Sequence, residues 1–212
     1  MTESTWLRCD DPNLLLYEAN KALPEQLRRV ACLCCQRIFK EHPHLFYGSR
    51  VSSEEYEYPA FWEPETLVAA LEAAEACEGG APAPEHTERV SEIAESGHDR
   101  WQWAKYRLGD TASLWDYEIA FTIWKCAEAV AACCATDIRG SISHCLKSAA
   151  AAMDFQMEDE AKQIAAVAKE RRVQAEIVRS LIEYPPRFGM KMFWSGLVAR
   201  FVARLSRLSR SR

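Results

Sequence analysis

Residues 111–135 form the stretch that decides the fold, TASLWDYEIAFTIWKCAEAVAACCA. On a helix, its large apolar side chains cover most of the circumference: Leu114, Trp115, Tyr117, Ile119, Phe121, Ile123, Trp124, Cys126 and Val130. Only Glu118, Lys125 and Glu128 leave a narrow polar strip. A helix that is apolar on nearly all sides belongs in the middle of a bundle. The stretch therefore predicts an all-α fold, a single multi-helix bundle with a central apolar helix at about 111–135.

The chain before this helix also shows helix signals. Asp11-Pro12 and Pro24 are typical helix starts, because Asp caps the first turn and Pro suits its first position. Beyond Pro24, apolar side chains recur at steps of three and four, at Leu27, Val30, Ala31, Cys34 and Ile38. Residues 45–62 have no clear period and predict a structured loop. Pro64 then predicts the start of another helix.

Two glycines and one serine suggest further helix boundaries. Gly97 and Gly109 predict two separate helices, at about 85–96 and 98–108, because Gly often follows the last helical residue. Ser141 predicts the start of a later helix. Alternating β-branched runs bounded by turns are missing, so we expect almost no β-structure.

The last helix of the body is predicted from about Glu158 to Glu183. Its apolar face consists of Ile164, Ala168, Ala175, Val178 and Ile182. Arg171 falls within that face. Because an unpaired buried charge is costly, we expect its guanidinium to meet a carboxylate or to reach water along its stem.

The charge distribution divides the chain into a body and a tail. Residues 1–186 are predicted to form the helical bundle domain, with a linker-like Gly- and Pro-rich segment at 79–84 inside it. Residues 187–212 contain seven Arg and Lys residues and no acidic residue. The net charge of the chain is −5, so the other 186 residues together carry −12. This asymmetry points to the tail as a binding element.

Composition excludes several protein classes. Hydrophobic residues make up 49% and charged residues 27%, which is typical of a globular protein. The N-terminus lacks the apolar core of a secretory signal, and no run reaches the roughly 18 apolar residues of a membrane span. Nine cysteines, an odd number that includes adjacent ones, argue against a disulfide framework. We therefore expect reduced, mostly buried thiols in a cytoplasmic protein.

Three segments resemble an uncharacterised family of alanine-rich, helical bacterial proteins. Residues 1–12, MTESTWLRCDDP, are similar to the family's opening, MTExEWL followed by DP. Residues 27–39, LRRVACLCCQRIF, are similar to its LRxFAxACCRRIW helix, and residues 174–187, QAEIVRSLIEYPPR, resemble its QAxLLRDIFGNPFRP end. The resemblance implies a structural role for the Cys34-Cys35 helix. This chain departs from the family where a basic tail replaces the usual acidic segment.

Cysteines and histidines raise a metal-site hypothesis. The candidates are Cys32 with Cys35, Cys126 with Cys133, and His144 with Cys145. Two turn-spaced pairs on facing helices could hold zinc. However, Cys34 falls on the apolar stripe, and no spacing matches a zinc finger or ribbon. We expect structural thiols, with no metal and no cofactor.

Catalytic motifs are equally weak. Glu41 with His44 and Glu95 with His98 match the Glu-x-x-His pattern of di-iron bundles. Pro43 and Gly97 are expected to place both pairs at helix ends, where surface or capping roles are more natural. No G-x-S-x-G, P-loop or G-x-G-x-x-G motif occurs. We expect a non-catalytic protein, with a metal-dependent helical enzyme as the alternative.

Residues 98–107, HDRWQWAKYR, alternate aromatic and basic side chains. On a helix, Trp101 and Lys105 share one side, while Trp103 and Arg107 share another. We expect the aromatic rings to pack in the core. The alternative is an interaction patch at Trp101, Trp103 and Arg107.

The tail is the sharpest functional signal. As a helix, residues 190–212 present apolar and basic side chains, among them Phe193, Trp194, Leu197, Phe201, Arg200, Arg204 and Arg207. Such a helix suits the acidic body of the chain, an anionic membrane or the groove of a partner protein. The acidic body argues against nucleic acid. We therefore expect a helical interaction or scaffold protein whose tail docks on a protein partner, with peripheral binding to the inner face of the membrane as the alternative.

Overall fold

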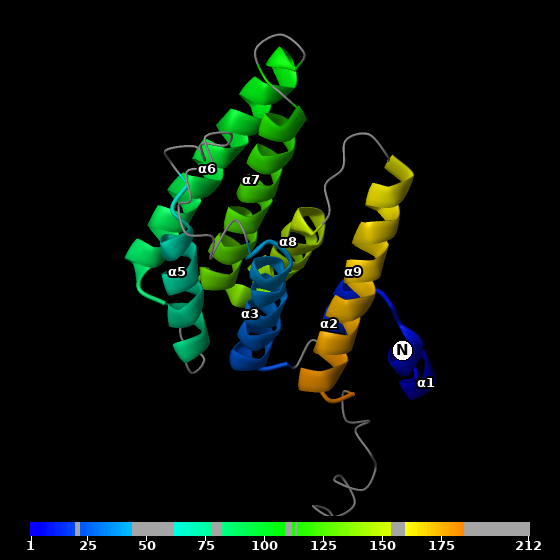
Figure 1. Cartoon of the computed structure of the whole chain (residues 1–212). Coiled ribbons are helices and arrows are strands. Elements are labelled where there is room, and N and C mark those ends of the chain that lie inside the picture. Colours follow the sequence, from blue (N-terminus) through cyan, green and yellow to red (C-terminus); the bar gives the residue numbers. More distant parts are fainter. Residues whose placement is uncertain are drawn as a thin grey trace, which may run out of the picture.

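Helices make up the regular structure of the part of the chain that the structure describes. The computed structural model describes residues 1–19, 22–43, 62–77, 82–108, 112, 114–153 and 160–184. Its helices are α1 (Glu3–Arg8), α2 (Pro12–Glu18), α3 (Pro24–Glu41), α5 (Pro64–Ala76), α6 (Pro84–Arg107), α7 (Leu114–Cys134), α8 (Ile138–Ala152) and α9 (Glu160–Leu181). Apart from one isolated bridge between Leu108 and Ala112, the described residues contain no β-structure. The predicted all-α bundle is confirmed (Figure 1).

Local capping signals set where several helices begin. The Asp11 side chain accepts hydrogen bonds from the backbone N–H groups at the start of α2, and Pro12 occupies the first turn. Pro24 and Pro64 likewise occupy the first turns of α3 and α5. These predicted starts are confirmed. The predicted start at Ser141 is wrong by three residues, because the Asp137 side chain caps the helix at Gly140 N and α8 begins at Ile138.

The central helix of the bundle is α7. It contacts α3, α5, α6 and α8 (Figure 1). Its interior side chains are fully or almost fully buried, among them Ile119, Ile123, Cys126, Val130 and Cys133. The polar strip of Glu118, Lys125 and Glu128 is only partly exposed. The prediction of a central apolar helix is therefore confirmed.

One long helix, α6, replaces the two that were predicted at 85–96 and 98–108. The helix runs without a break from Pro84 to Arg107, so the interpretation of Gly97 as a helix end is wrong. Gly97 is buried where α6 crosses α7, and a Cβ placed on it would lie 3.0 Å from Trp124 Cα. Glycine is present here because only a residue without a side chain lets the two backbones approach so closely.

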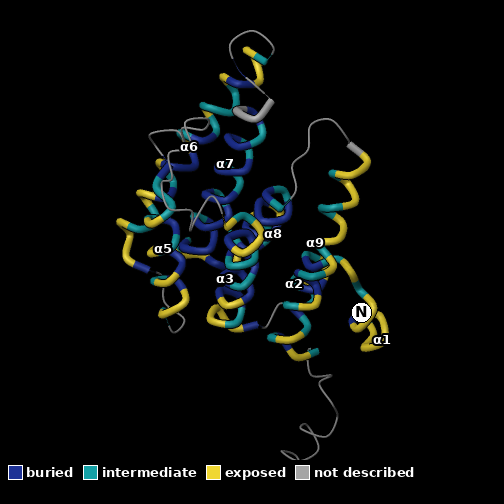
Figure 2. Tube along the Cα trace, in the orientation of Figure 1, coloured by how far each residue is buried: buried dark blue, intermediate teal, exposed yellow. Residues whose placement is uncertain are grey.

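The core extends across the bundle from α3 to α9. The predicted apolar stripe of α3 is buried throughout: Leu27, Val30, Ala31, Cys34 and Ile38. On α9 the prediction holds only for the second half, where Ala175, Val178 and Ile182 are buried. Ile164 and Ala168 are exposed, because the first half of α9 extends past the helices that cover the second half (Figure 2).

The two ends of the described chain lie together. Trp6, buried in the short helix α1, packs edge-on against Tyr184 with ring centroids 5.8 Å apart. The Tyr184 hydroxyl donates to the backbone oxygen of Met1 at 2.8 Å. None of the described helices combines the length and the apolar character that crossing a lipid bilayer requires.

Candidate functional site

The predicted tail site lies outside the residues that the structure describes, which end at residue 184. This applies to Phe193, Trp194, Leu197, Arg200, Phe201, Arg204 and Arg207. The division of the chain at residue 187 and docking by the tail therefore stay predictions. The candidate side chains that the structure does place belong to the body.

Trp101 lies in an aromatic cluster between α6 and α7. Its ring centroid is 4.9 Å from that of Trp124 and 5.9 Å from those of Phe121 and Tyr117. His98 packs edge-on against Trp124 at 4.6 Å. Edge-to-face and offset contacts of this kind add about 0.5–1.5 kcal/mol per pair beyond area burial. Trp101 thus packs within the α6–α7 hairpin.

Lysine side chains lie over the rings of this cluster. Lys125 Nζ is 3.4 Å from the centroid of the Trp124 ring, and Lys105 Nζ is 5.2 Å from that of Trp101. Lys125 Nζ also donates to Glu128 at 2.8 Å. A cation over an aromatic face contributes about 0.5–2 kcal/mol, depending on its exposure to water. Both cation–π contacts join side chains of one helix, Lys125 with Trp124 on α7 and Lys105 with Trp101 on α6.

Trp103 and Tyr106 lie on the outer side of the same helix end. Successive helical residues are about 100° apart, so Trp103 points away from the side that Trp101 uses. Trp103 is 38% exposed and Tyr106 is 80% exposed. The guanidinium carbon of Arg100 lies 4.0 Å from the Trp103 ring centroid, and Arg107 is exposed. We name Arg100, Trp103, Tyr106 and Arg107 the aromatic-basic face.

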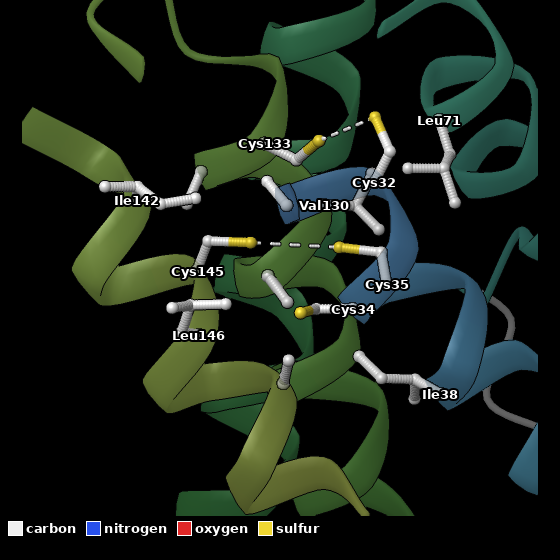
Figure 3. Close-up of a cluster of buried hydrophobic side chains, with 14 of the residues drawn as sticks. Cys32, Cys34, Cys35, Ile38, Leu71, Val130, Cys133, Ile142, Cys145 and Leu146 are labelled. Carbon is white, nitrogen blue, oxygen red and sulfur yellow. Dashed lines mark hydrogen bonds between the residues drawn. The ribbon is translucent and has the colours of Figure 1, made fainter. Parts of the chain in front are cut away.

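Four buried cysteines come together between α3, α7 and α8 (Figure 3). Cys32 Sγ lies 3.5 Å from Cys133 Sγ, and Cys35 Sγ lies 3.9 Å from Cys145 Sγ. The sequence spacing predicts the pairs Cys32 with Cys35 on α3 and Cys126 with Cys133 on α7. The structure instead joins thiols of different helices, and Cys126 takes no part in these two contacts.

The surroundings of these thiols shift their pKa values in different directions. The hydrogen bond to Cys133, together with burial, raises the pKa of Cys32 well above its ordinary value. Burial raises the pKa of Cys34 and of Cys126. By contrast, the pKa of Cys133 is held well below its ordinary value, because Cys32 and Cys35 hydrogen-bond to its sulfur and the charge of Arg28 lies nearby. The pKa of Cys133 is therefore shifted in the opposite direction from those of Cys32 and Cys35.

The histidine pairs do not assemble into a metal centre in the part of the chain that is described. No group of three or more His, Cys, Asp or Glu side chains there is placed to hold a metal ion. His42 Nε2 lies 2.7 Å from the backbone oxygen of Ala152, and His44 falls outside the described ranges. Glu95 and His98 lie in the interior of α6, so the expectation that they sit at a helix end is wrong.

Arg28 is a buried charge that the sequence analysis missed. It is 2% exposed, and its guanidinium donates to the backbone oxygens of Cys133 at 2.5 Å and of Ala135 at 3.1 Å. These carbonyl groups lie at the C-terminal end of α7, where the helix dipole favours a positive charge. The available signal was spacing, because Arg28 precedes Cys32 by one helical turn, next to the apolar stripe of α3.

Glu170 is a second buried charge, and no feature of the sequence indicated its burial. It is 3% exposed, and Arg37 donates three hydrogen bonds to it at 2.9–3.3 Å, which joins α3 to α9. Arg171 Nη2 lies 2.8 Å from Asp11 Oδ1. This contact confirms the expectation that Arg171 meets a carboxylate.

Comparison of the chain with known protein families, curated proteins and solved structures finds no match. The resemblance to an alanine-rich bacterial family stays a prediction.

Proposed function

We propose that this protein is a non-catalytic helical interaction domain that binds a partner protein through the aromatic-basic face of α6. The observation that carries the proposal is the contrast between two tryptophans only two residues apart. Trp101 packs against the rings of α7, whereas Trp103 is exposed together with Tyr106. Trp101 packs between α6 and α7, so the packing of this hairpin does not explain the exposed rings of Trp103 and Tyr106.

The residue types of this face support protein binding. Trp, Tyr and Arg are enriched among the residues that contribute most to the binding energy of protein interfaces. The contact of Arg100 with the Trp103 ring also restricts both side chains before binding, which lowers the entropy lost in a complex. A partner with an apolar pocket bordered by carboxylates would complement these rings and arginines.

The basic tail is a second docking element in this proposal. Residues 187–212 carry seven positive charges, while the rest of the chain carries −12. A tail of this composition binds acidic surfaces with strong dependence on salt. In the proposal the tail binds the same partner as the aromatic-basic face. Binding at one of these two sites then raises the effective concentration of the partner at the other.

Co-purification from the native host tests the aromatic-basic face. The informative variant is Trp103→Ala with Tyr106→Ala. Its matched control is Tyr17→Ala, because Tyr17 is similarly exposed but lies on α2. Aromatic residues at the centre of an interface contribute about 2 kcal/mol or more each. We therefore expect the double variant to recover at least about tenfold less partner. The proposal is wrong if the double variant recovers the same proteins as the wild type, or if the control loses them equally.

Flotation with anionic liposomes separates protein docking from membrane docking by the tail. The full chain is compared with a chain that stops after Pro186. The proposal expects no difference between the two. Flotation of the full chain alone would assign the tail to a membrane surface.

A further inference from the structure

A pocket leads from the surface toward the buried thiols. Its volume is about 490 Å³, and its lining includes Arg28 and Cys32. These two side chains are buried, whereas Glu25 and Arg29, which also line the pocket, are exposed. Cys32 lines the pocket although its own exposed fraction is 0%, and its sulfur lies 3.5 Å from that of Cys133, which is buried behind it.

We propose that Cys32 and Cys133 are a modification site, a dithiol that hydrogen peroxide entering this pocket oxidises to a disulfide between α3 and α7. The proposal is independent of partner binding by α6. A disulfide has an S–S distance of about 2.05 Å, so the sulfurs have to approach by about 1.5 Å. Rotation of the two side chains can supply a shift of this size.

The environment of Cys133 favours its attack on a peroxide. The thiolate is the nucleophilic form of cysteine, and a nearby cation stabilises it. Hydrogen bonds from Cys32 and Cys35 and the charge of Arg28 lower the pKa of Cys133 from its ordinary value, which raises the fraction of thiolate at a given pH. Cys32 hydrogen-bonds to the same sulfur and can resolve the first oxidation product.

Arg28 has one buried donor, its Nε–H, that the fold does not use. Its two Nη atoms donate to backbone oxygens of Cys133 and Ala135. Among the described residues, the buried Nε–H of Arg28 has no hydrogen-bond partner. An unsatisfied buried donor is costly, and an oxygen atom of a peroxide would satisfy it. The guanidinium would then stabilise the negative charge that develops on the leaving oxygen.

The reaction balances in two steps. First, the Cys133 thiolate attacks one oxygen of hydrogen peroxide, an S–O bond forms, the O–O bond breaks and hydroxide leaves, which produces a sulfenic acid. Second, Cys32 loses its proton and attacks the sulfenic sulfur of Cys133. The S–S bond forms, the S–O bond breaks, and the leaving hydroxide takes up the proton to become water. The two sulfurs are oxidised, and the peroxide is reduced to water and hydroxide.

Peptide mapping of the full-length reduced protein tests the site. The protein is exposed to stoichiometric hydrogen peroxide without denaturant, treated with catalase, blocked with excess maleimide in urea, digested and analysed by mass spectrometry. We expect a peptide pair linked through Cys32 and Cys133 to form before other products, and dithiothreitol to reverse it. Formation of a Cys35–Cys145 linkage first, or oxidation only after unfolding in urea, would overturn the proposal.

Variants assign the roles of the two thiols. Cys133→Ser should prevent oxidation of Cys32, and Cys32→Ser should leave Cys133 as a sulfenic acid that a dimedone probe traps. Cys126→Ser is the matched control, because Cys126 is an equally buried cysteine of α7, and this variant should still form the linkage. Failure of Cys126→Ser to do so, with its helical circular dichroism intact, contradicts the assignment.

The pH dependence of thiol oxidation tests the role of Cys133 in the wild-type protein, without any variant. Because the pKa of Cys133 is lowered, its oxidation rate should fall less between pH 8 and pH 7 than that of an ordinary thiol. For an ordinary thiol, with a pKa of about 8.5, the rate would fall several-fold over this interval.

Arg28→Lys keeps a charge but loses the planar fork of donors. We expect it to slow oxidation at least tenfold, and an unchanged rate would remove Arg28 from the site.

Discussion

Gly97 of α6 lies directly against the backbone of Trp124 of α7, where an added Cβ would be 3.0 Å from Trp124 Cα and 3.1 Å from its nitrogen. Gly97→Ala should therefore lower the free energy of unfolding by up to about 2 kcal/mol. Overpacking costs about 1–3 kcal/mol, and the higher helix propensity of Ala offsets about 1 kcal/mol of that. Urea unfolding followed by circular dichroism measures the difference. Ser96→Ala, at the neighbouring helical position, is the control and should not destabilise.

Arg37 neutralises the buried carboxylate of Glu170. Arg37→Met should lower the free energy of unfolding by about 2–4 kcal/mol, because it leaves a buried charge without its partner, although Arg37 itself is partly exposed. The combined variant Arg37→Met with Glu170→Leu should be more stable than Arg37→Met alone. Chemical unfolding of the wild type, both single variants and the combined variant gives the coupling energy. Equal stability of the single and combined variants would show that the pair is not buried in solution.

Asp11 has two roles that substitution can separate. Its side chain caps α2 by accepting from Asn13 N at 2.9 Å, and it pairs with Arg171 at 2.8 Å. Asp11→Ala removes both and should cost about 1–2 kcal/mol of stability. Asp11→Asn keeps a good cap and loses an exposed ion pair, which is worth about 0–1 kcal/mol. Thermal unfolding should therefore rank Asp11→Asn close to the wild type, and the reverse order would contradict the capping role.

The nine thiols should differ in access to bulky reagents. Cys9 and Cys77 are half-buried, and the other seven are buried. A fluorescent maleimide should label Cys9 and Cys77 in the native protein and reach the rest only through local or global unfolding, at least about tenfold more slowly. Labelling with and without denaturant, followed by peptide mapping, checks this order. Fast native labelling of Cys126 would contradict the packing of α7.

Glu128 should make stability depend on pH. Burial acts to raise its pKa, but hydrogen bonds from Lys125 and Ser148 and the charges of Lys125 and His144 outweigh it, so the pKa lies below the ordinary 4.5. A carboxylate with a lowered pKa stabilises the fold above its unfolded pKa and loses this effect as the pH falls through the folded pKa. Glu128→Gln should thus cost on the order of 1–2 kcal/mol at pH 7.

The same difference should shrink as the pH falls below 4.5, where the wild-type carboxylate becomes protonated. Urea unfolding of both proteins between pH 3 and pH 7 provides the comparison. Glu72→Gln, at an exposed position of α5, is the control for a change of charge alone. A difference between wild type and Glu128→Gln that does not vary with pH would contradict the predicted linkage.

The sequence alone could predict several helix starts and most of the buried faces, because their signals are local. A cap or a first-turn proline lies within a few residues of the helix that it begins, as at Asp11 and Pro24. Apolar spacing marks which side of a helix is buried, and it identified the stripe of α3 and the central position of α7. The same local rule failed at Gly97, because the reason for that glycine lies on another helix.

Only the tertiary structure decided which side chains meet. Cys32 and Cys133 are separated by 101 positions, and Arg28 and Cys133 by 105. Trp101 and Trp103 share one helix, yet only the position of α7 made one of them interior and left the other exposed. Periodicity specifies the face of each helix, whereas contacts between helices depend on how the bundle places them in space, and no local pattern encodes that placement.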